Sequence, residues 1–326
     1  MNIITTVVGS YPIDDEYKPN TINEKILDKL DMYDEFKKPI HQTVDDYVKY
    51  NIDIICDGQP RNDMVKIFTS KINGFKTVDN TVHIIGKITP SANPIGVSDL
   101  KYAAKIAHQK NPKYQLYATI DEIFKHEKCG IKGMITGPTS IIHSCNITNF
   151  YEDRKTAIYD MAYALQNEAK ELEKAGACAI QIDEPFISTG VEDIEVSKRG
   201  VEIISKAVNI PVILHVCGDL EDVLEDLLEF DVEILDFEFR GMPENIKTLK
   251  KVWNKNTDKI ISIGCIDTKL HEVDNIKDVV KTVKQVVDIT DEKNVIIDPD
   301  CGMRMLDKKI AQEKLSLLDE IKKEGV

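Results

Sequence analysis

The stretch ILHVCGDL, residues 213–220, places a histidine and a cysteine two positions apart at the end of an apolar run. Residues two apart on an extended strand point to the same side, so His215 and Cys217 could both bind one metal ion. Imidazole nitrogen and thiolate sulfur are preferred ligands of zinc. Free cysteine is also a common core residue, so the pair alone leaves a structural role open.

Other residues that could do chemistry also stand at the ends of apolar runs. Cys301 follows the last run and Glu238 ends an earlier one, so a histidine, two cysteines and a glutamate could meet. Two thiolates favour zinc over magnesium or calcium, which prefer oxygen ligands. We therefore predict a Zn²⁺ site made by His215, Cys217, Glu238 and Cys301. The other cysteines are interpreted as core thiols: Cys56, Cys129, Cys145, Cys178 and Cys265.

The elements that must position these residues are eight short apolar runs, most of them followed by a helical pattern. Near-continuous Val and Ile runs are typical of parallel strands buried on both faces. Eight such strands alternating with helices predict an α/β fold, a (β/α)8 TIM barrel, whose reactive groups gather at the carboxyl ends of the strands. A doubly wound open sheet remains the alternative. The runs are 3–10, 52–58, 131–138, 178–185, 211–218, 232–239, 259–267 and 294–302.

We predict that residues 1–326 form a single catalytic barrel, because no low-complexity linker divides the chain. The section 59–130 is too long for a simple crossover. Within it, TVHIIGKI predicts a strand or hairpin and DLKYAAKIAHQK predicts a helix. This section is therefore interpreted as an insertion after the second strand, or a lid over the site.

The composition limits the class of protein. A net charge of -14 argues against nucleic acid as the main partner, because phosphate binding needs clustered Lys and Arg. No run approaches the ~18 apolar residues of a membrane helix, so no membrane partner is expected. Seven scattered cysteines make a poor disulfide framework and predict a reducing, cytoplasmic location.

Six motifs in this order resemble the C-terminal catalytic barrel of cobalamin-independent methionine synthases. The resemblance spans essentially the whole chain and lacks that family's separate N-terminal barrel, which is typical of a short, archaeal form. It implies a zinc-dependent methyltransferase that converts homocysteine to methionine. The motifs are VGSYP at 8–12, DGQPRNDMV at 57–65, ITGPTS at 135–140, QIDEP at 181–185, HVCG at 215–218 and DPDCGMR at 298–304.

The resemblance implies roles for the residues that match. The four predicted zinc ligands match the family's ligands, with a small gap in the alignment before Glu238. The segment Val8, Gly9 and Ser10 matches the one whose backbone and hydroxyl hold the homocysteine carboxylate. Asp183 matches the carboxylate that pairs with the homocysteine amino group, and Glu184 stands beside it in the same motif.

Three departures from the family pattern bear on the substrates. Gln59 replaces a glutamate that is a second partner of the amino group, so the charge-assisted part of that contact is lost. A folate-binding tryptophan is missing, with Ser144 about in its place. The family's Asp-x-His element reads DTKLH, so Asp267 is in place while His271, the candidate acid–base group, stands four residues on.

These departures favour a methyl-corrinoid, either methylcobalamin or a methylated corrinoid protein, over methyl-folate as the methyl donor. Three rivals stay open. The nearest is a related barrel that methylates coenzyme M or another thiol from a corrinoid. The others are a zinc hydrolase or lyase, which the two thiolates and the lack of an HExxH motif disfavour, and a non-catalytic zinc barrel that binds a corrinoid protein.

Overall fold

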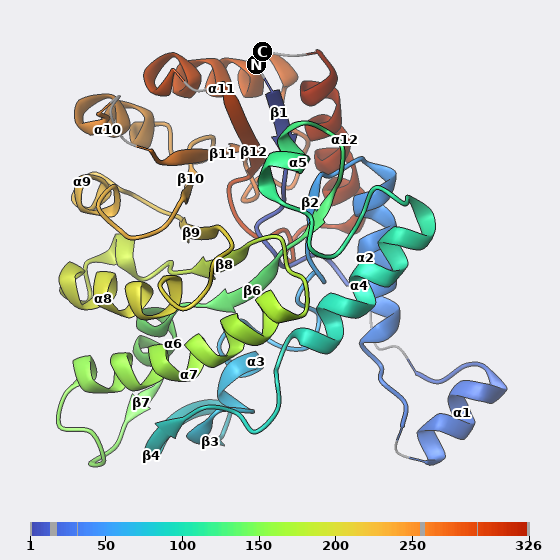
Figure 1. Ribbon diagram of the computed structural model, residues 1–326, viewed down its shortest axis with the longest axis vertical. Helices are drawn as coiled ribbons and strands as arrows, with labels where there is room; N and C mark the ends of the chain where they lie inside the picture. The colour runs from blue at the N-terminus through green and yellow to red at the C-terminus, as the bar shows by residue number, and fades with distance from the viewer. Residues whose placement is uncertain (1, 14–17, 31, 255–257, 292, 325–326) are drawn as a thin grey trace.

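The structure is a computed structural model that describes residues 2–13, 18–30, 32–254, 258–291 and 293–324. In this part of the chain, parallel strands gather at the centre and helices surround them (Figure 1). The central strands, in order around the ring, are β1 (Asn2–Thr5), β2 (Ile54–Ile55), β5 (Gly130–Ile131) continued by β6 (Gly133–Thr136), β8 (Ile180–Asp183), β9 (Val212–Val216), β10 (Ile234–Glu238), β11 (Ile260–Ile266) and β12 (Asn294–Pro299).

The pairing of these strands closes the ring. Seven of them form one sheet in the order β1-β12-β11-β10-β9-β8-β6, and β2 pairs with β5 in parallel. A parallel bridge from Thr6 to Ile54 joins β1 to β2, and only Lys132 separates β5 from β6. The predicted (β/α)8 barrel is therefore confirmed, and each of the eight predicted runs contains a barrel strand.

The strands form because their side chains are apolar on both faces. Every residue of β9 and β10 is buried, with the barrel interior on one side and the surrounding helices on the other. The polar residues in these strands, such as His215 and Asp236, are buried as well. A polar group in such a place needs a partner, and the site is built from these groups.

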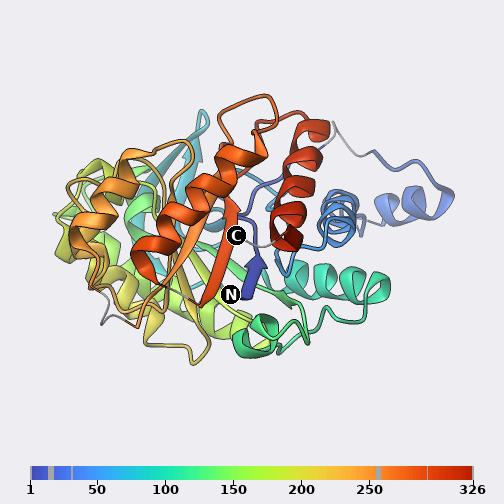
Figure 2. The ribbon, with the colours of Figure 1, turned by 90° about the horizontal axis from the view of Figure 1, so that it is seen from above.

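Three of the helices that cover the barrel begin with a side-chain cap, at Asp153, Asp193 and Asn275. Asp153 accepts a hydrogen bond from the amide of Thr156 at the start of α7, and Asn275 caps α11 in the same way. In Figure 2, α11 and α12 lie over the strands β11 and β1 that they contact. The helices are α2 (Lys37–Lys49), α4 (Val97–Lys110), α6 (Pro138–His143), α7 (Arg154–Lys174), α8 (Ile194–Ser205), α9 (Leu224–Leu227), α10 (Glu244–Val252), α11 (Ile276–Thr290) and α12 (Lys308–Glu324), with the short η1 (Ile187–Thr189).

The section 59–130 adds a hairpin and further helices between β2 and β5. TVHIIGKI lies in β4 (Thr81–Thr89), which pairs antiparallel with β3 (Asn73–Val78) and parallel with β7 (Asn146–Ile147). DLKYAAKIAHQK lies in α4, and two short helices, α3 (Lys66–Thr69) and α5 (Ile120–Phe124), complete the section. Its role as a lid stays a prediction.

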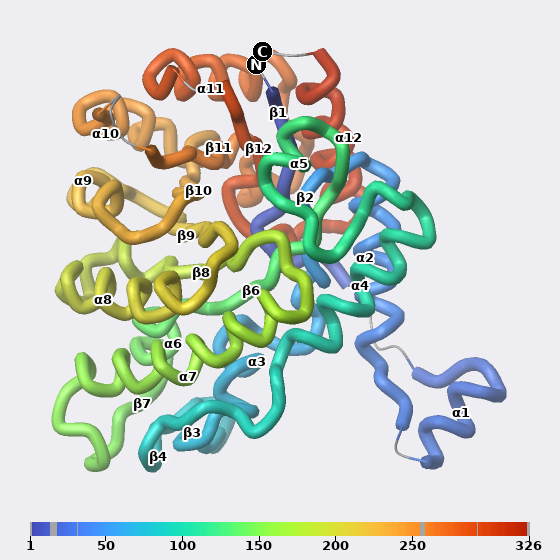
Figure 3. Tube along the Cα trace, viewed as in Figure 1, coloured from blue at the N-terminus to red at the C-terminus, as the bar shows by residue number. Residues whose placement is uncertain are grey.

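One helix stands apart from the barrel. The helix α1 (Ile22–Lys29) follows β1 and projects from the body at the lower right of Figures 1 and 3. None of its residues is buried. No helix in the described residues is both long enough and apolar enough to cross a membrane.

Candidate metal centre and substrate pocket

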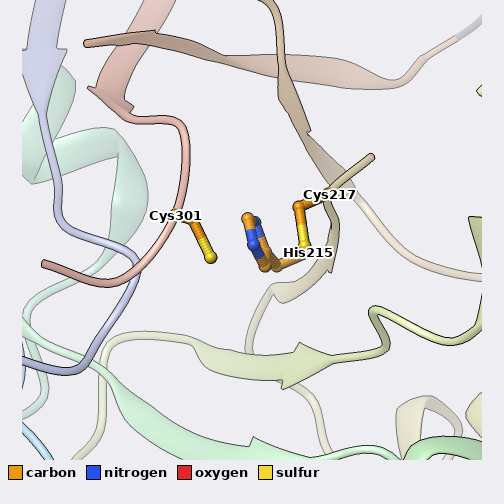
Figure 4. A group of neighbouring side chains, drawn as sticks. All are labelled: His215, Cys217 and Cys301. Atoms are coloured by element: carbon orange, nitrogen blue, oxygen red, sulfur yellow. The ribbon is translucent and has the colours of Figure 1, made fainter. Parts of the chain in front are cut away.

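Three of the four predicted metal ligands lie together at the carboxyl ends of the strands. His215 and Cys217 come from the end of β9, and Cys301 comes from the loop after β12 and points toward them (Figure 4). Their ligand atoms all lie within 4.8 Å of one another. An imidazole nitrogen and two sulfurs at this spacing can bind one metal ion, and they are the donors that zinc prefers.

The imidazole of His215 is oriented for a metal. Its Nδ1–H donates a hydrogen bond to Asp236 Oδ2 at 2.8 Å, and both side chains are almost fully buried. Its other nitrogen, Nε2, is buried without a hydrogen-bond partner among the described residues. Burial by itself would lower the pKa of His215, but the Asp236 carboxylate outweighs it and raises that pKa. A buried polar atom without a partner is costly, so Nε2 fits a metal ion.

The two neighbouring cysteine thiols have their pKa values shifted in opposite directions. The hydrogen bond with Cys217 lowers the pKa of the Cys301 thiol well below its usual range, and the neighbouring His215 lowers that pKa further. The same bond, together with burial, raises the pKa of Cys217. A thiolate beside an imidazole is the form in which cysteine binds metal.

Glu238 lies close by but is not part of this three-residue group. Its Oε2 accepts a hydrogen bond from the Gly218 amide at 3.0 Å, and its Oε1 accepts one from Lys269 Nζ at 2.5 Å. The carboxylate is buried at the end of β10 with Lys269 reaching it from the next strand end. Its role as the fourth ligand stays a prediction.

A pocket opens beside the predicted metal ligands and contains most of the predicted substrate residues. It holds about 900 Å³ of empty space, counting its open mouth. The predicted residues Val8, Ser10, Gln59 and Asp183 line it. The remaining lining residues are His215, Cys217, Cys301, Asp63, Met64, Pro185, Gly302, Arg304 and Met305.

Gly9 lies at a bend after β1, between the lining residues Val8 and Ser10. A Cβ atom at Gly9 would lie 2.9 Å from Gln59 Oε1 and 3.0 Å from Met134 Cε. Its carbonyl accepts a hydrogen bond from the Tyr47 hydroxyl. The segment 8–10 is therefore held against Gln59 only because residue 9 lacks a side chain.

Asp183 is the buried acidic group of the pocket, whereas Asp63 in the same lining is exposed. Burial raises its pKa to about 6, and the nearby His215 partly offsets that rise. Its Oδ1 accepts a hydrogen bond from Gln181 Nε2 at 2.6 Å. Gln59 stands opposite with a φ of 49°, and its carbonyl accepts a hydrogen bond from the Arg304 guanidinium.

Besides Gly9 and Glu238, three predicted residues do not line the pocket. Glu184 is fully buried under α6, where its carboxylate accepts hydrogen bonds from the amides of Thr139 and Ser140, both at 2.9 Å. Asp267 accepts a hydrogen bond from the Lys269 amide in the loop after β11. His271 is exposed in the same loop. The structure therefore brings neither member of the predicted acid–base pair into the pocket.

Two residues of the site, Asp236 and Arg304, are not among the predicted ones. Asp236 holds His215, and it stands in the middle of the apolar run VEILDFEF, with Leu235 before it and Phe237 after it. A charged residue inside a buried strand is a signal for a partner, but not for which one. Arg304 ends the motif DPDCGMR and donates to the carbonyls of Gln59 and Asn62, so it joins the loop after β12 to the loop after β2.

Known proteins resemble this chain along its whole length. A family model for the catalytic domain of the cobalamin-independent synthases matches residues 3–324. The methionine synthase of Methanothermobacter thermautotrophicus is 43% identical over 315 residues, covering 96% of this chain and 97% of the relative. That of Methanocaldococcus jannaschii is 36% identical over 332 residues, covering 98% of this chain and 99% of the relative.

Solved structures agree on the fold. A B12-independent methionine synthase from Shewanella sp. W3-18-1, in complex with selenomethionine, superimposes with a TM-score of 0.79 at 20% identity, covering 98% of this chain and 97% of that one. The predicted family is confirmed by the family model and by the archaeal relatives. This chain belongs to the cobalamin-independent methionine synthase family, a family of methyltransferases.

Proposed function

We propose that this protein is a methionine synthase that transfers a methyl group to the sulfur of homocysteine at a zinc site, with a methyl-corrinoid as donor. The observation that carries the proposal is the grouping of His215, Cys217 and Cys301 within 4.8 Å beside a pocket lined by Ser10 and Asp183. A sulfur bound at the metal would lie at one end of an amino-acid-sized cradle.

The three ligands fit zinc better than a hard cation. Two sulfurs and an imidazole nitrogen are soft or borderline donors, and the fourth position falls to Glu238 or to the substrate sulfur. Zinc bound here would supply a thiolate, because a thiol that coordinates the metal loses its proton near neutral pH. Asp236 fixes the tautomer of His215, so that Nε2 carries the lone pair toward the ion.

The chain's own residues would hold the amino acid. Val8 and Ser10 line the pocket, and we assign binding of the carboxylate to the Ser10 hydroxyl and the backbone of residues 8–10. Asp183 would bind the ammonium group as a charge-assisted partner, with Gln59 as a neutral one. Orientation of the sulfur toward the donor methyl is the main source of rate in such a transfer. His271 is exposed, so we assign no proton transfer to it.

The donor is inferred from what surrounds the pocket. Ser144, near the expected folate tryptophan, donates its hydroxyl hydrogen to the Ser140 carbonyl within α6 and offers no ring for stacking. Trp253 follows α10, and it does not line the pocket. Coenzyme M is the weaker candidate acceptor, because it carries a sulfonate but no ammonium group for Asp183 to bind.

The experiment is a turnover assay of zinc-loaded protein. Methylcobalamin is supplied with homocysteine or with coenzyme M, and demethylation is followed by absorbance, with methyl-tetrahydrofolate as a second donor. Cys301→Ser is expected to lose bound zinc and at least about 100-fold in turnover, since metal catalysis contributes several kcal/mol. Cys129→Ser, a thiol outside the pocket, is the matched control and should retain both.

Each outcome has one meaning. Homocysteine-dependent demethylation that is lost in Cys301→Ser supports the acceptor, the donor and the site together. Equal turnover with methyl-tetrahydrofolate would overturn the corrinoid assignment. Turnover with coenzyme M alone would overturn the acceptor, and full activity of metal-free Cys301→Ser would overturn the zinc site.

A further inference from the structure

A lysine ammonium group is buried inside the barrel, where the proposed reaction gives it no role. Lys132 lies between β5 and β6 and is 2% exposed. Its Nζ donates hydrogen bonds to Thr6 Oγ1 at 3.0 Å, to the Val7 carbonyl and to Gln181 Oε1. A buried ammonium is costly unless its hydrogens are all used, and these three acceptors use them.

The contact with Lys132 fixes the orientation of the Gln181 amide. Gln181 Oε1 accepts a hydrogen bond from the Lys132 ammonium, so the amide NH₂ group must face the opposite way. A flipped amide would place its NH₂ group against the ammonium, and neither group can accept a hydrogen bond. Nε2 then donates to the Val8 carbonyl and to Asp183 Oδ1, both at 2.6 Å. Gln181 is fully buried on β8, so water cannot replace these bonds.

This network ends on two residues that line the substrate pocket. Val8 follows β1 and Asp183 ends β8, so one amide joins two separate parts of the proposed cradle. With Oδ1 of Asp183 engaged by Gln181, the other oxygen is the one available to a ligand. The direction in which that oxygen points depends on Gln181, and the amide of Gln181 depends on Lys132.

We propose that Lys132 and Gln181 are positioning residues that orient Asp183 and the Val8 segment to receive the ammonium group of homocysteine. This inference rests on the proposed function, in which Asp183 is the partner of that group. Lys132 makes no hydrogen bond to Asp183 or to the metal group, because its ammonium donates to Gln181, Thr6 Oγ1 and the Val7 carbonyl, so its hydrogen-bonded route to Asp183 runs through Gln181. Lys132 and Gln181 together make the pocket select thiols that carry an amino group over thiols that lack one.

The test measures binding of three thiols to zinc-loaded protein by isothermal titration calorimetry. Homocysteine carries both charged groups, 3-aminopropanethiol lacks the carboxylate, and 4-mercaptobutanoate lacks the amine. The variants are Gln181→Met, Lys132→Met, the double variant and Asp183→Asn. Gln166→Met is the matched control, a glutamine on α7 whose Nε2 donates to the Ile203 carbonyl away from the pocket.

We expect Gln181→Met and Lys132→Met each to weaken binding of the two amino thiols by about 10- to 100-fold, as for loss of a hydrogen bond to a charged group. Binding of 4-mercaptobutanoate should change by less than about 3-fold. The double variant should be no weaker than Gln181→Met, because residues in one chain of contacts are not additive. Gln166→Met should bind all three thiols like the unchanged protein.

Three results would overturn the inference. An equal loss for all three thiols would mean that the pair only supports the fold, and additive losses in the double variant would mean that Lys132 does not act through Gln181. Unchanged binding in Gln181→Met would remove the role altogether. If Lys132→Met does not fold, Gln181→Met and Gln181→Asn carry the test. An Asp183→Asn variant that keeps its amino-thiol affinity would instead refute the proposed cradle.

Discussion

At the scale of single residues, the site depends on polar side chains placed in strands that are otherwise apolar. His215, Asp236, Gln181 and Lys132 are each at most 2% exposed, and each is paired with another polar group. Such groups are stable in a low-dielectric interior only when they are paired, so each fixes the geometry of its neighbour. Two predictions follow from particular residues.

The first prediction concerns the partner of His215. Asp236→Asn weakens the hydrogen bond that fixes the histidine tautomer, so zinc affinity should fall by about 10- to 100-fold. Competition with a zinc chelator measures this affinity. Asp231→Asn, whose side chain is 58% exposed, is the control and should bind zinc normally. Unchanged zinc affinity in Asp236→Asn would refute the role of Asp236 in orienting His215 for the metal.

The second prediction concerns pH and Asp57, which lines a second cavity on the other side of Gln59. Burial, with Asp99 nearby, raises the pKa of Asp57 from an ordinary 3.8 to about 6. Between these values the folded protein holds a proton that the unfolded chain has lost, so this carboxyl makes the fold less stable as pH rises.

Asp57→Asn removes that pH-dependent loss. The variant should be more stable than the unchanged protein by an amount that grows from about pH 4 to pH 6. This difference in free energy of unfolding should reach up to about 3 kcal/mol and stay constant above about pH 6. Urea unfolding of both proteins across this range is the measurement. A constant difference at every pH would contradict the raised pKa.

At the scale of elements, α6 shows how a strand end and a helix start are fitted together. Glu184 follows β8 and accepts hydrogen bonds from the Thr139 and Ser140 amides and from the Ser140 hydroxyl, the last at 2.6 Å. The carboxylate satisfies backbone donors that a helix start leaves free. It packs so close to Gly137 that a Cβ atom there would lie 2.2 Å from Glu184.

Gly137→Ala should therefore destabilise the protein by about 1–3 kcal/mol, because the added methyl group overpacks this junction. The control is Gly86→Ala in β4, where a Cβ atom meets nothing within 4 Å. That variant should stay within about 0.5 kcal/mol of the unchanged protein. Urea unfolding compares the two, and equal stabilities would mean that the α6 junction yields without strain.

At the scale of the whole molecule, the C-terminal helix α12 contacts β1 and also binds the loop after β11. Lys314 on α12 is fully buried, and its Nζ donates to Asp274 Oδ2 at 2.7 Å and to the Asp267 carbonyl at 2.8 Å. Arg240 contacts the other oxygen of Asp274. These bonds hold the loop after β11, from which Lys269 reaches Glu238.

Lys314→Met leaves part of the Asp274 charge buried without its partner, so the free energy of unfolding should fall by about 3 kcal/mol or more. Lys309→Met on the same helix is the control, because that side chain is 84% exposed and its ion pair contributes little. Thermal unfolding of both variants is the measurement. A Lys314→Met protein as stable as the control would refute the structural role of this ion pair.

The sequence by itself determined the barrel and the grouping of His215, Cys217 and Cys301 at the strand ends. Each of the eight apolar runs formed a barrel strand, because a run that is apolar on both faces has few places other than a parallel sheet between helices. His215 and Cys217 pointed to the same side because strand residues alternate, and Cys301 joined them because parallel strands end together.

Only the tertiary structure decided where the other polar side chains point. Glu184 is next to Asp183 in sequence, yet it faces α6 while Asp183 faces the pocket, since neighbours on a strand point to opposite sides. His271 lies outside the pocket because its place depends on the path of a loop. The partners of Lys132 and Gln181 come from distant strands, and which buried groups meet depends on the register of the closed barrel.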